Sequence, residues 1–146
     1  MYKHILLPVD ITQKTSWHGS LPVALKFCEV FDSYLHILTV IPDFGMSIVG
    51  NFFPDNYEAR ALDEAKAKLS EFIKSNIPQD IKVQKIVAVG TVYQEIINTA
   101  VHIEADLIVM NSHRPELKDY LLGPNTARVV RHGKTSVHVV RDFETD

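Results

Sequence analysis

Short apolar runs alternate with longer segments of helical periodicity along the whole chain. Residues 2–9 (YKHILLPV), 34–41 (YLHILTVI) and 105–110 (ADLIVM) are apolar runs of strand length, typical of strands buried in a parallel sheet. Residues 81–89 (IKVQKIVAV) alternate enough in polarity to predict an edge strand, and residues 136–141 (SVHVVR) predict the last strand. The pattern therefore predicts five strands.

Four segments between these runs carry apolar side chains at the spacing of one helix face. Asp55 with Glu58 and Thr91 with Gln94 resemble capping boxes at two of the helix starts, and Gly133 is expected to end the last helix. The apolar positions that define the four helices are Leu21, Ala24, Leu25, Cys28 and Phe31; Leu62, Ala65, Leu69, Phe72 and Ile73; Ile96, Ile97, Ala100 and Val101; and Val129 and Val130.

Strands that alternate with helices predict the α/β class. We expect one domain over residues 1–146, an open parallel five-stranded sheet with helices on both faces and right-handed crossovers. Ligands of such sheets bind outside the carboxyl ends of the strands, where the strand order reverses. If the reversal separates the first strand from the fourth, Asp10, Val40 and the loop from Asn111 converge on one crevice.

Composition and charge narrow the classes of protein. A net charge of -3, without a run of Lys or Arg, argues against a protein whose main function is to bind nucleic acid. The single cysteine, Cys28, has no partner for an internal disulfide and is expected in the core. The first apolar run is too short for a signal sequence, and no stretch approaches a membrane span. A cytoplasmic location without membrane contact fits these features.

Residues 111–126 (NSHRPELKDYLLGPNT) lead into the last predicted helix. A glycine-containing turn before a helix offers free N–H groups and the positive end of the helix dipole, which suit phosphate, and Gly123 with Pro124 forms such an entry. Arg114 offers a charge-assisted contact. Pro124 lacks an N–H, although the asparagine and threonine that follow carry side-chain donors. An ordinary surface turn fits the same residues, so both interpretations stay open.

Two further positions have alternative roles. Asp10, after the first strand, suits a ribose hydroxyl or a magnesium ion, or else it caps the following turn. The backbone of Val40 and Ile41 suits an adenine edge, although apolar residues such as these more often belong to the core.

Several sharper motifs are absent. Residues 133–135 (GKT) lack the first glycine of a P-loop and precede a strand, and Ser112 beside His113 is not a catalytic triad. The histidines are scattered without zinc-site spacing, and His36 and His138 are expected to lie in strands.

The chain resembles the universal stress protein family over essentially its full length. The resemblance is carried by YKHILLPVD at residues 2–10, by Val40, by Gly90 with Thr91, and by ADLIVMNSHRPELKDYLLGPNTARVVRHGKTSVHVVR at residues 105–141. The HRP, YLLG and VVRH pieces look most like the small bacterial F and G types. The resemblance implies an adenine nucleotide alpha hydrolase-like fold with strand order 3-2-1-4-5, and dimers that pair through the last strand.

The resemblance also implies binding of ATP, with Mg²⁺ as a companion ion. The family's phosphate motif is G-x2-G-x9-G-[S/T]. Asn111 stands at its first glycine, Arg114 at its second and Gly123 at its third, with eight intervening residues, and Pro124 replaces the hydroxyl residue. The predicted nucleotide-binding residues are Pro8, Val9, Asp10, Val40, Met110, Asn111, Ser112, His113, Arg114, Gly123, Pro124, Asn125 and Thr126.

Three functions follow as alternatives. The first is an ATP-binding dimeric regulator of the stress response, with Asp10 at ribose and Val40 at adenine. The second is a nucleotide-free module that acts through dimerisation, higher homo-oligomers or an unidentified protein partner. The third is a slow ATPase, for which His113 is the one nearby candidate base, although it fits a loop-orienting role better. No catalytic residue and no protein ligand to a metal is assigned.

Overall fold

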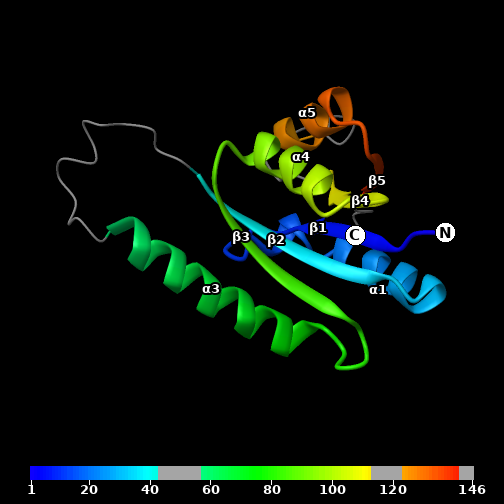
Figure 1. Ribbon diagram of the computed structural model, residues 1–146, viewed down its shortest axis with the longest axis horizontal. Helices are drawn as coiled ribbons and strands as arrows, with labels where there is room; N and C mark the ends of the chain where they lie inside the picture. Colours follow the sequence, from blue (N-terminus) through cyan, green and yellow to red (C-terminus); the bar gives the residue numbers. More distant parts are fainter. Residues whose placement is uncertain (43–56, 113–122, 142–146) are drawn as a thin grey trace, which may run out of the picture.

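A computed structural model of the protein describes residues 1–42, 57–112 and 123–141. Its five strands form one parallel sheet in the order β3-β2-β1-β4-β5, which confirms the predicted α/β class and strand order (Figure 1). The elements are β1 (His4–Pro8), the 3₁₀ turn η1 (Lys14–Ser16), α1 (Ser20–Phe31), β2 (Tyr34–Pro42), α3 (Tyr57–Asn76), β3 (Val83–Gly90), α4 (Val92–His102), β4 (Leu107–Asn111), α5 (Pro124–His132) and β5 (Ser136–Val140).

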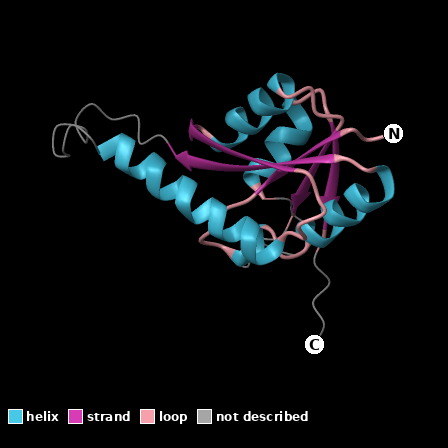
Figure 2. Ribbon diagram, turned by 60° about the horizontal axis from the view of Figure 1, so that its bottom comes forward, coloured by secondary structure: helices cyan, strands magenta, loops and turns pink. Residues whose placement is uncertain are grey.

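Helices cover both faces of the sheet. The pair α1 and α3 packs on one face, and the pair α4 and α5 packs on the other (Figures 1 and 2). Successive residues of a strand point to opposite faces. Accordingly, Ile5 and Leu7 of β1 pack on the α1 side, whereas Leu6 packs with Ile96 of α4 and Val129 of α5. A strand covered on both sides favours apolar residues on both faces, which explains the apolar run at residues 5–8 of β1.

Cys28 lies on the buried face of α1, as predicted. Burial raises the pKa of its thiol to about 11, so the thiol stays protonated near neutral pH. Only 3% of the residue is exposed, and it packs in the core between α1 and the sheet. Cys28 is therefore a packing residue.

Two predicted helix starts differ from the structure. The periodic segment at residues 16–31 predicts a first helix that starts at Ser16, but the helix begins at Ser20, because residues 14–16 form a separate 3₁₀ turn. Thr91 is the N-cap of α4, but its side chain makes no capping hydrogen bond, so the predicted capping box with Gln94 is wrong. The carboxylate that lies next to the helix entry belongs instead to Glu95. The predicted cap at Asp55 lies outside the described residues.

The strand order reverses between β1 and β4, as expected. β1 pairs with β2 on one side and with β4 on the other, and all these pairings are parallel. The carboxyl ends of the three strands therefore meet at one edge of the sheet. None of the helices in the described part of the chain is long and apolar enough to span a bilayer.

Candidate functional site

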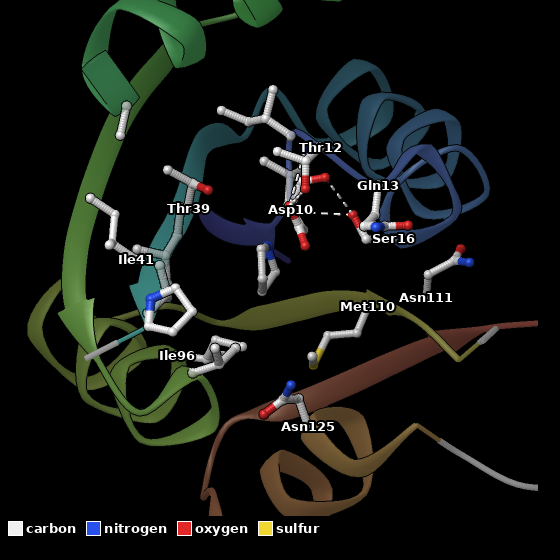
Figure 3. A pocket seen from close by; sticks show the side chains of 18 of the residues that line it. Asp10, Thr12, Gln13, Ser16, Thr39, Ile41, Ile96, Met110, Asn111 and Asn125 are labelled. Atoms are coloured by element: carbon white, nitrogen blue, oxygen red, sulfur yellow. Dashed lines mark hydrogen bonds between the residues drawn. The ribbon is translucent and has the colours of Figure 1, made fainter. Parts of the chain in front are cut away.

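A cavity of about 790 Å³ opens at the carboxyl ends of β1, β2 and β4 (Figure 3). Four parts of the chain line it. They are apolar side chains of the strands and of α4, the polar turn after β1, one side of α3, and the first turn of α5. The apolar part includes Leu38, Val40, Ile41, Val92, Ile96 and Met110.

Asp10 holds the turn after β1 and also lines the cavity. Its Oδ1 accepts hydrogen bonds from the Thr12 N–H at 3.1 Å and from the Thr12 hydroxyl at 2.7 Å. Its backbone N–H donates to Ser16 Oγ at 2.9 Å, and that hydroxyl donates back to the Asp10 carbonyl at 3.0 Å. The turn-capping role considered for Asp10 is thus present. Among the described residues, none of the hydrogen bonds of this turn involves the second carboxylate oxygen of Asp10.

The ends of β1 and β2 provide an apolar wall. Pro8 and Val40 line the cavity, and Val40 is only half-buried. Val9 is 5% exposed, belongs to the core, and donates its N–H to the Leu38 carbonyl at 2.8 Å. Val9 therefore contributes mainly packing to this wall.

The end of β4 is linked to its neighbours by hydrogen bonds. Asn111 Nδ2 donates to the Thr15 carbonyl at 2.8 Å, and the Ser112 N–H donates to the Val140 carbonyl at 2.9 Å. Asn111 is the last residue of the strand. It does not adopt the left-handed conformation for which asparagine is suited, since the described non-glycine residues with positive φ are Asp32 and Glu104.

The N-terminus of α5 faces the cavity. Gly123 is the N-cap and Pro124 the first helical residue, as predicted. The Ala127 N–H donates to the Gly123 carbonyl at 2.9 Å. The backbone N–H groups of Asn125 and Thr126 precede it and have no acceptor within the helix. The Thr126 side chain differs from the prediction, because its buried hydroxyl donates to the Asn111 carbonyl at 3.0 Å and is not a free donor.

Most of the predicted site residues that the structure describes line this one cavity. Pro124 is exposed and does not line it, and His113 and Arg114 lie outside the described residues. Those that line the cavity are Pro8, Val9, Asp10, Val40, Met110, Asn111, Ser112, Gly123, Asn125 and Thr126.

Sequence reasoning missed two parts of the lining. One is the turn after Asp10, where Thr12, Thr15 and Ser16 place hydroxyl groups; a polar run directly after a buried strand was the available signal. The other is α3, where Glu64 and Lys68 form an exposed ion pair with Lys68 Nζ 3.9 Å from Glu64 Oε1. No motif marks that pair, because helical periodicity identifies only the apolar face of a helix.

Comparisons with known proteins agree with this architecture. Residues 1–141 match the model of the Universal stress protein family. Universal stress protein G of Shigella flexneri is 29% identical over 143 residues, which cover 97% of this chain and 100% of that protein. The solved structure of MJ0577, a universal stress protein of Methanocaldococcus jannaschii, has a TM-score of 0.74 and 29% identity, covering 99% of each chain.

Two more distant structures of the same fold contain adenine nucleotides. A universal stress protein in complex with cAMP has a TM-score of 0.61 and 22% identity, covering 96% of this chain and 97% of that one. The protein from Archaeoglobus fulgidus in complex with dAMP has a TM-score of 0.68 and 17% identity, covering 96% and 98%.

Proposed function

This chain belongs to the universal stress protein family, and from that premise we propose that it is a cytoplasmic, dimeric regulator of stress responses that binds ATP. Family structures are known with the adenine nucleotides cAMP and dAMP. One observation carries the proposal: a single cavity has an apolar wall, a carboxylate and a helix N-terminus around it. Its volume of about 790 Å³ lies in the range typical of small-ligand sites.

The adenine ring would lie against the apolar wall at the end of β2. Val40 and Ile41 border this side, and Met110 borders the other. A flat aromatic ring buries apolar area here, while peptide groups at the end of a strand supply hydrogen-bond partners for its edge. The side chains would select for shape, and the backbone would select for adenine.

Ribose and phosphates would occupy the polar parts of the cavity. The Asp10 carboxylate can accept hydrogen bonds from ribose hydroxyls. The first turn of α5 offers the N–H groups of Asn125 and Thr126 and the positive end of the helix dipole to phosphate oxygens. Mg²⁺ would depend mainly on the phosphates, because among the described residues no three His, Cys, Asp or Glu side chains gather as a metal site.

A nucleotide-free interaction module is the second candidate, and specific bonds favour it. Thr126 uses its hydroxyl proton within the protein, Asp10 is engaged in a turn, and Pro124 has no N–H to offer. In this case the cavity would be structural, and function would lie in homodimer contacts or in a protein partner.

Mass spectrometry of small molecules released from freshly purified protein, followed by calorimetric titration with Mg-ATP, tests the proposal. We expect co-purified adenine nucleotide and saturable binding. No released nucleotide and no saturable binding at millimolar ATP would sink the proposal and leave the interaction module. Phosphate release during the same incubation distinguishes a slow ATPase from a binding protein.

A matched pair of variants tests where the phosphates bind. Asn125→Asp adds a negative charge at the N-terminus of α5, so we expect ATP affinity to fall at least tenfold and adenosine affinity to fall much less. Asn98→Asp makes the same change on the exposed face of α4, away from the cavity, and should leave both affinities unchanged. Equal loss of ATP and adenosine affinity in Asn125→Asp would contradict this placement of the phosphates.

A further inference from the structure

Asn111 connects two walls of the cavity through both of its polar ends. Its side-chain amide donates to the Thr15 carbonyl, 2.8 Å away, in the turn after β1. Its backbone carbonyl accepts the buried Thr126 hydroxyl of α5 at 3.0 Å. Asn111 is 8% exposed, so these bonds lie largely out of water, where a hydrogen bond is electrostatically stronger. One residue of β4 therefore joins the wall that carries Asp10 to the wall formed by α5.

The turn after β1 is closed within itself. Asp10 is bonded to Thr12 and to Ser16, and the Gln13 N–H donates to the Asp10 carbonyl at 3.0 Å. These bonds make residues 10–16 a small unit, but they do not fix that unit relative to β4. The amide of Asn111 does so. In Figure 3 its side chain lies on the side of Ser16 and Gln13, across the cavity from Thr39 and Ile41.

We propose that Asn111 is a positioning residue, whose amide fixes the turn at residues 10–16 against β4 and so sets the distance between Asp10 and the first turn of α5. A glycine here, as in the G-x2-G pattern, has no side chain with which to make this bond. Where a glycine would only let the backbone come close, the asparagine thus forms a hydrogen-bonded cross-link between β4 and the turn. Its effect on a ligand rests on the proposed nucleotide function, since Asn111 acts through Thr15 and the turn.

Such a cross-link preorganises the cavity. A wall that is already in place costs less conformational entropy when a ligand binds. The turn carries the carboxylate proposed to face ribose, so the benefit belongs to the nucleoside part of the ligand. Loss of the cross-link should weaken adenosine, AMP and ATP by a similar factor, unlike a change at the phosphate end.

Two substitutions remove the amide donor in different ways. Asn111→Asp keeps the size but replaces the donor with an acceptor that faces the Thr15 carbonyl, and Asn111→Gly removes the side chain without adding charge. Asn98→Asp on α4 is the matched control for the added charge. Thermal unfolding shows which variants fold. Asn111→Gly keeps the test available if the buried carboxylate prevents folding.

Two measurements separate the cross-link from its effect on binding. Without ligand, amide hydrogen exchange of residues 12–17 and the fluorescence of Trp17, the only tryptophan, report the order of the turn. Trp17 directly follows the turn and packs edge-to-face on Phe72, with the two ring centroids 4.8 Å apart. Calorimetric titration with adenosine and with ATP reports the effect on the ligand.

We expect exchange in the turn to become about three- to tenfold faster in both Asn111 variants, and the affinities for adenosine and ATP to fall together by about fivefold. Unchanged exchange and fluorescence would overturn the positioning role, whatever the ligand data show. Faster exchange with unchanged affinities would overturn the preorganisation while the proposed function stands. If the unmodified protein binds no nucleotide, the proposed function and the ligand effect fail together, and exchange alone then decides whether Asn111 holds the turn.

Discussion

Gly90 is held at a backbone angle that other residues resist. It ends β3 with φ at +152°, and an added Cβ would lie 2.6 Å from Glu95 Oε1. The flexible Glu95 side chain can move aside, so the contact alone is inexpensive. The backbone angle cannot be relieved in the same way, because side chains with a Cβ are strained there.

We therefore expect Gly90→Ala to lower the free energy of unfolding by about 1–3 kcal/mol, measured by urea denaturation. Gly19→Ala is the control. Gly19 precedes α1 with φ −87° and ψ −39°, a conformation that alanine adopts freely, so its effect should stay within about 0.5 kcal/mol. Equal effects of the two substitutions would show that the angle at Gly90 is not the cause.

A chain of polar side chains crosses three neighbouring strands. His36 of β2 lies between His4 of β1 and Gln84 of β3. Its Nε2 is 3.0 Å from His4 Nδ1, and its Nδ1 is 2.6 Å from Gln84 Oε1. The amide oxygen of Gln84 only accepts, so His36 Nδ1 carries a hydrogen and its Nε2 faces His4. Burial lowers the pKa of His36, and the nearby His4 lowers it further, while the bond to Gln84 opposes them.

This arrangement predicts a loss of stability in mild acid. In the unfolded chain His36 protonates as the pH falls through its ordinary value of 6.5, whereas the folded protein resists protonation until its lowered pKa is reached. The unfolded state binds more protons in that window, so the free energy of unfolding falls with falling pH, by up to about 1.4 kcal/mol per pH unit.

Urea denaturation between pH 7.5 and 5 measures this slope. His36→Gln removes the titrating group and should flatten the slope below pH 6.5. His102→Gln, at an exposed position of α4, should retain it. A slope that survives in His36→Gln would assign the acid sensitivity to other groups.

The first turn of α5 lacks one donor because of Pro124. Although the side chain at this position lies outside the cavity, a serine would restore a backbone N–H at the N-terminus of the helix, and the proline is not needed to start the helix. We expect Pro124→Ser to tighten ATP binding by about tenfold and to leave adenosine binding unchanged, measured by calorimetry. Pro78→Ser, in the turn after α3, serves as the control. Unchanged or weaker ATP affinity would contradict the proposed docking position.

Across the whole molecule, the sequence predicted what depends on local pattern. The apolar runs of β1, β2 and β4, the predicted edge strand β3 and the strand positions of His36 and His138 are confirmed. The convergence of Asp10 and Val40 followed from the rule for parallel sheets. The side-chain hydrogen bonds could not be predicted from the sequence. Thr126 and Asn111, like Asn111 and Thr15, are far apart along the chain and come into contact only after the sheet has formed.

The proposed homodimer depends on the last strand of the sheet, β5. β5 pairs with β4 and stands at one end of the sheet. Because the Ser112 N–H donates to the Val140 carbonyl, the N–H and C=O of Val140 point toward β4. These groups change side from one residue to the next, so the N–H and C=O of Val137 and Val139 point to the open edge. Those two residues would carry the hydrogen bonds of the proposed homodimer.

Val139→Pro removes one outward N–H without removing a bond to β4, so it should weaken the dimer and preserve the fold. We expect the dissociation constant to rise at least tenfold, measured by analytical ultracentrifugation, with an unchanged circular dichroism spectrum. Lys85→Pro is the control on the opposite edge. The Leu35 N–H donates to the Lys82 carbonyl, so alternation directs the N–H of Lys85 away from β2. A dimer that survives Val139→Pro, or one that Lys85→Pro disrupts equally, would place the contact elsewhere than on β5.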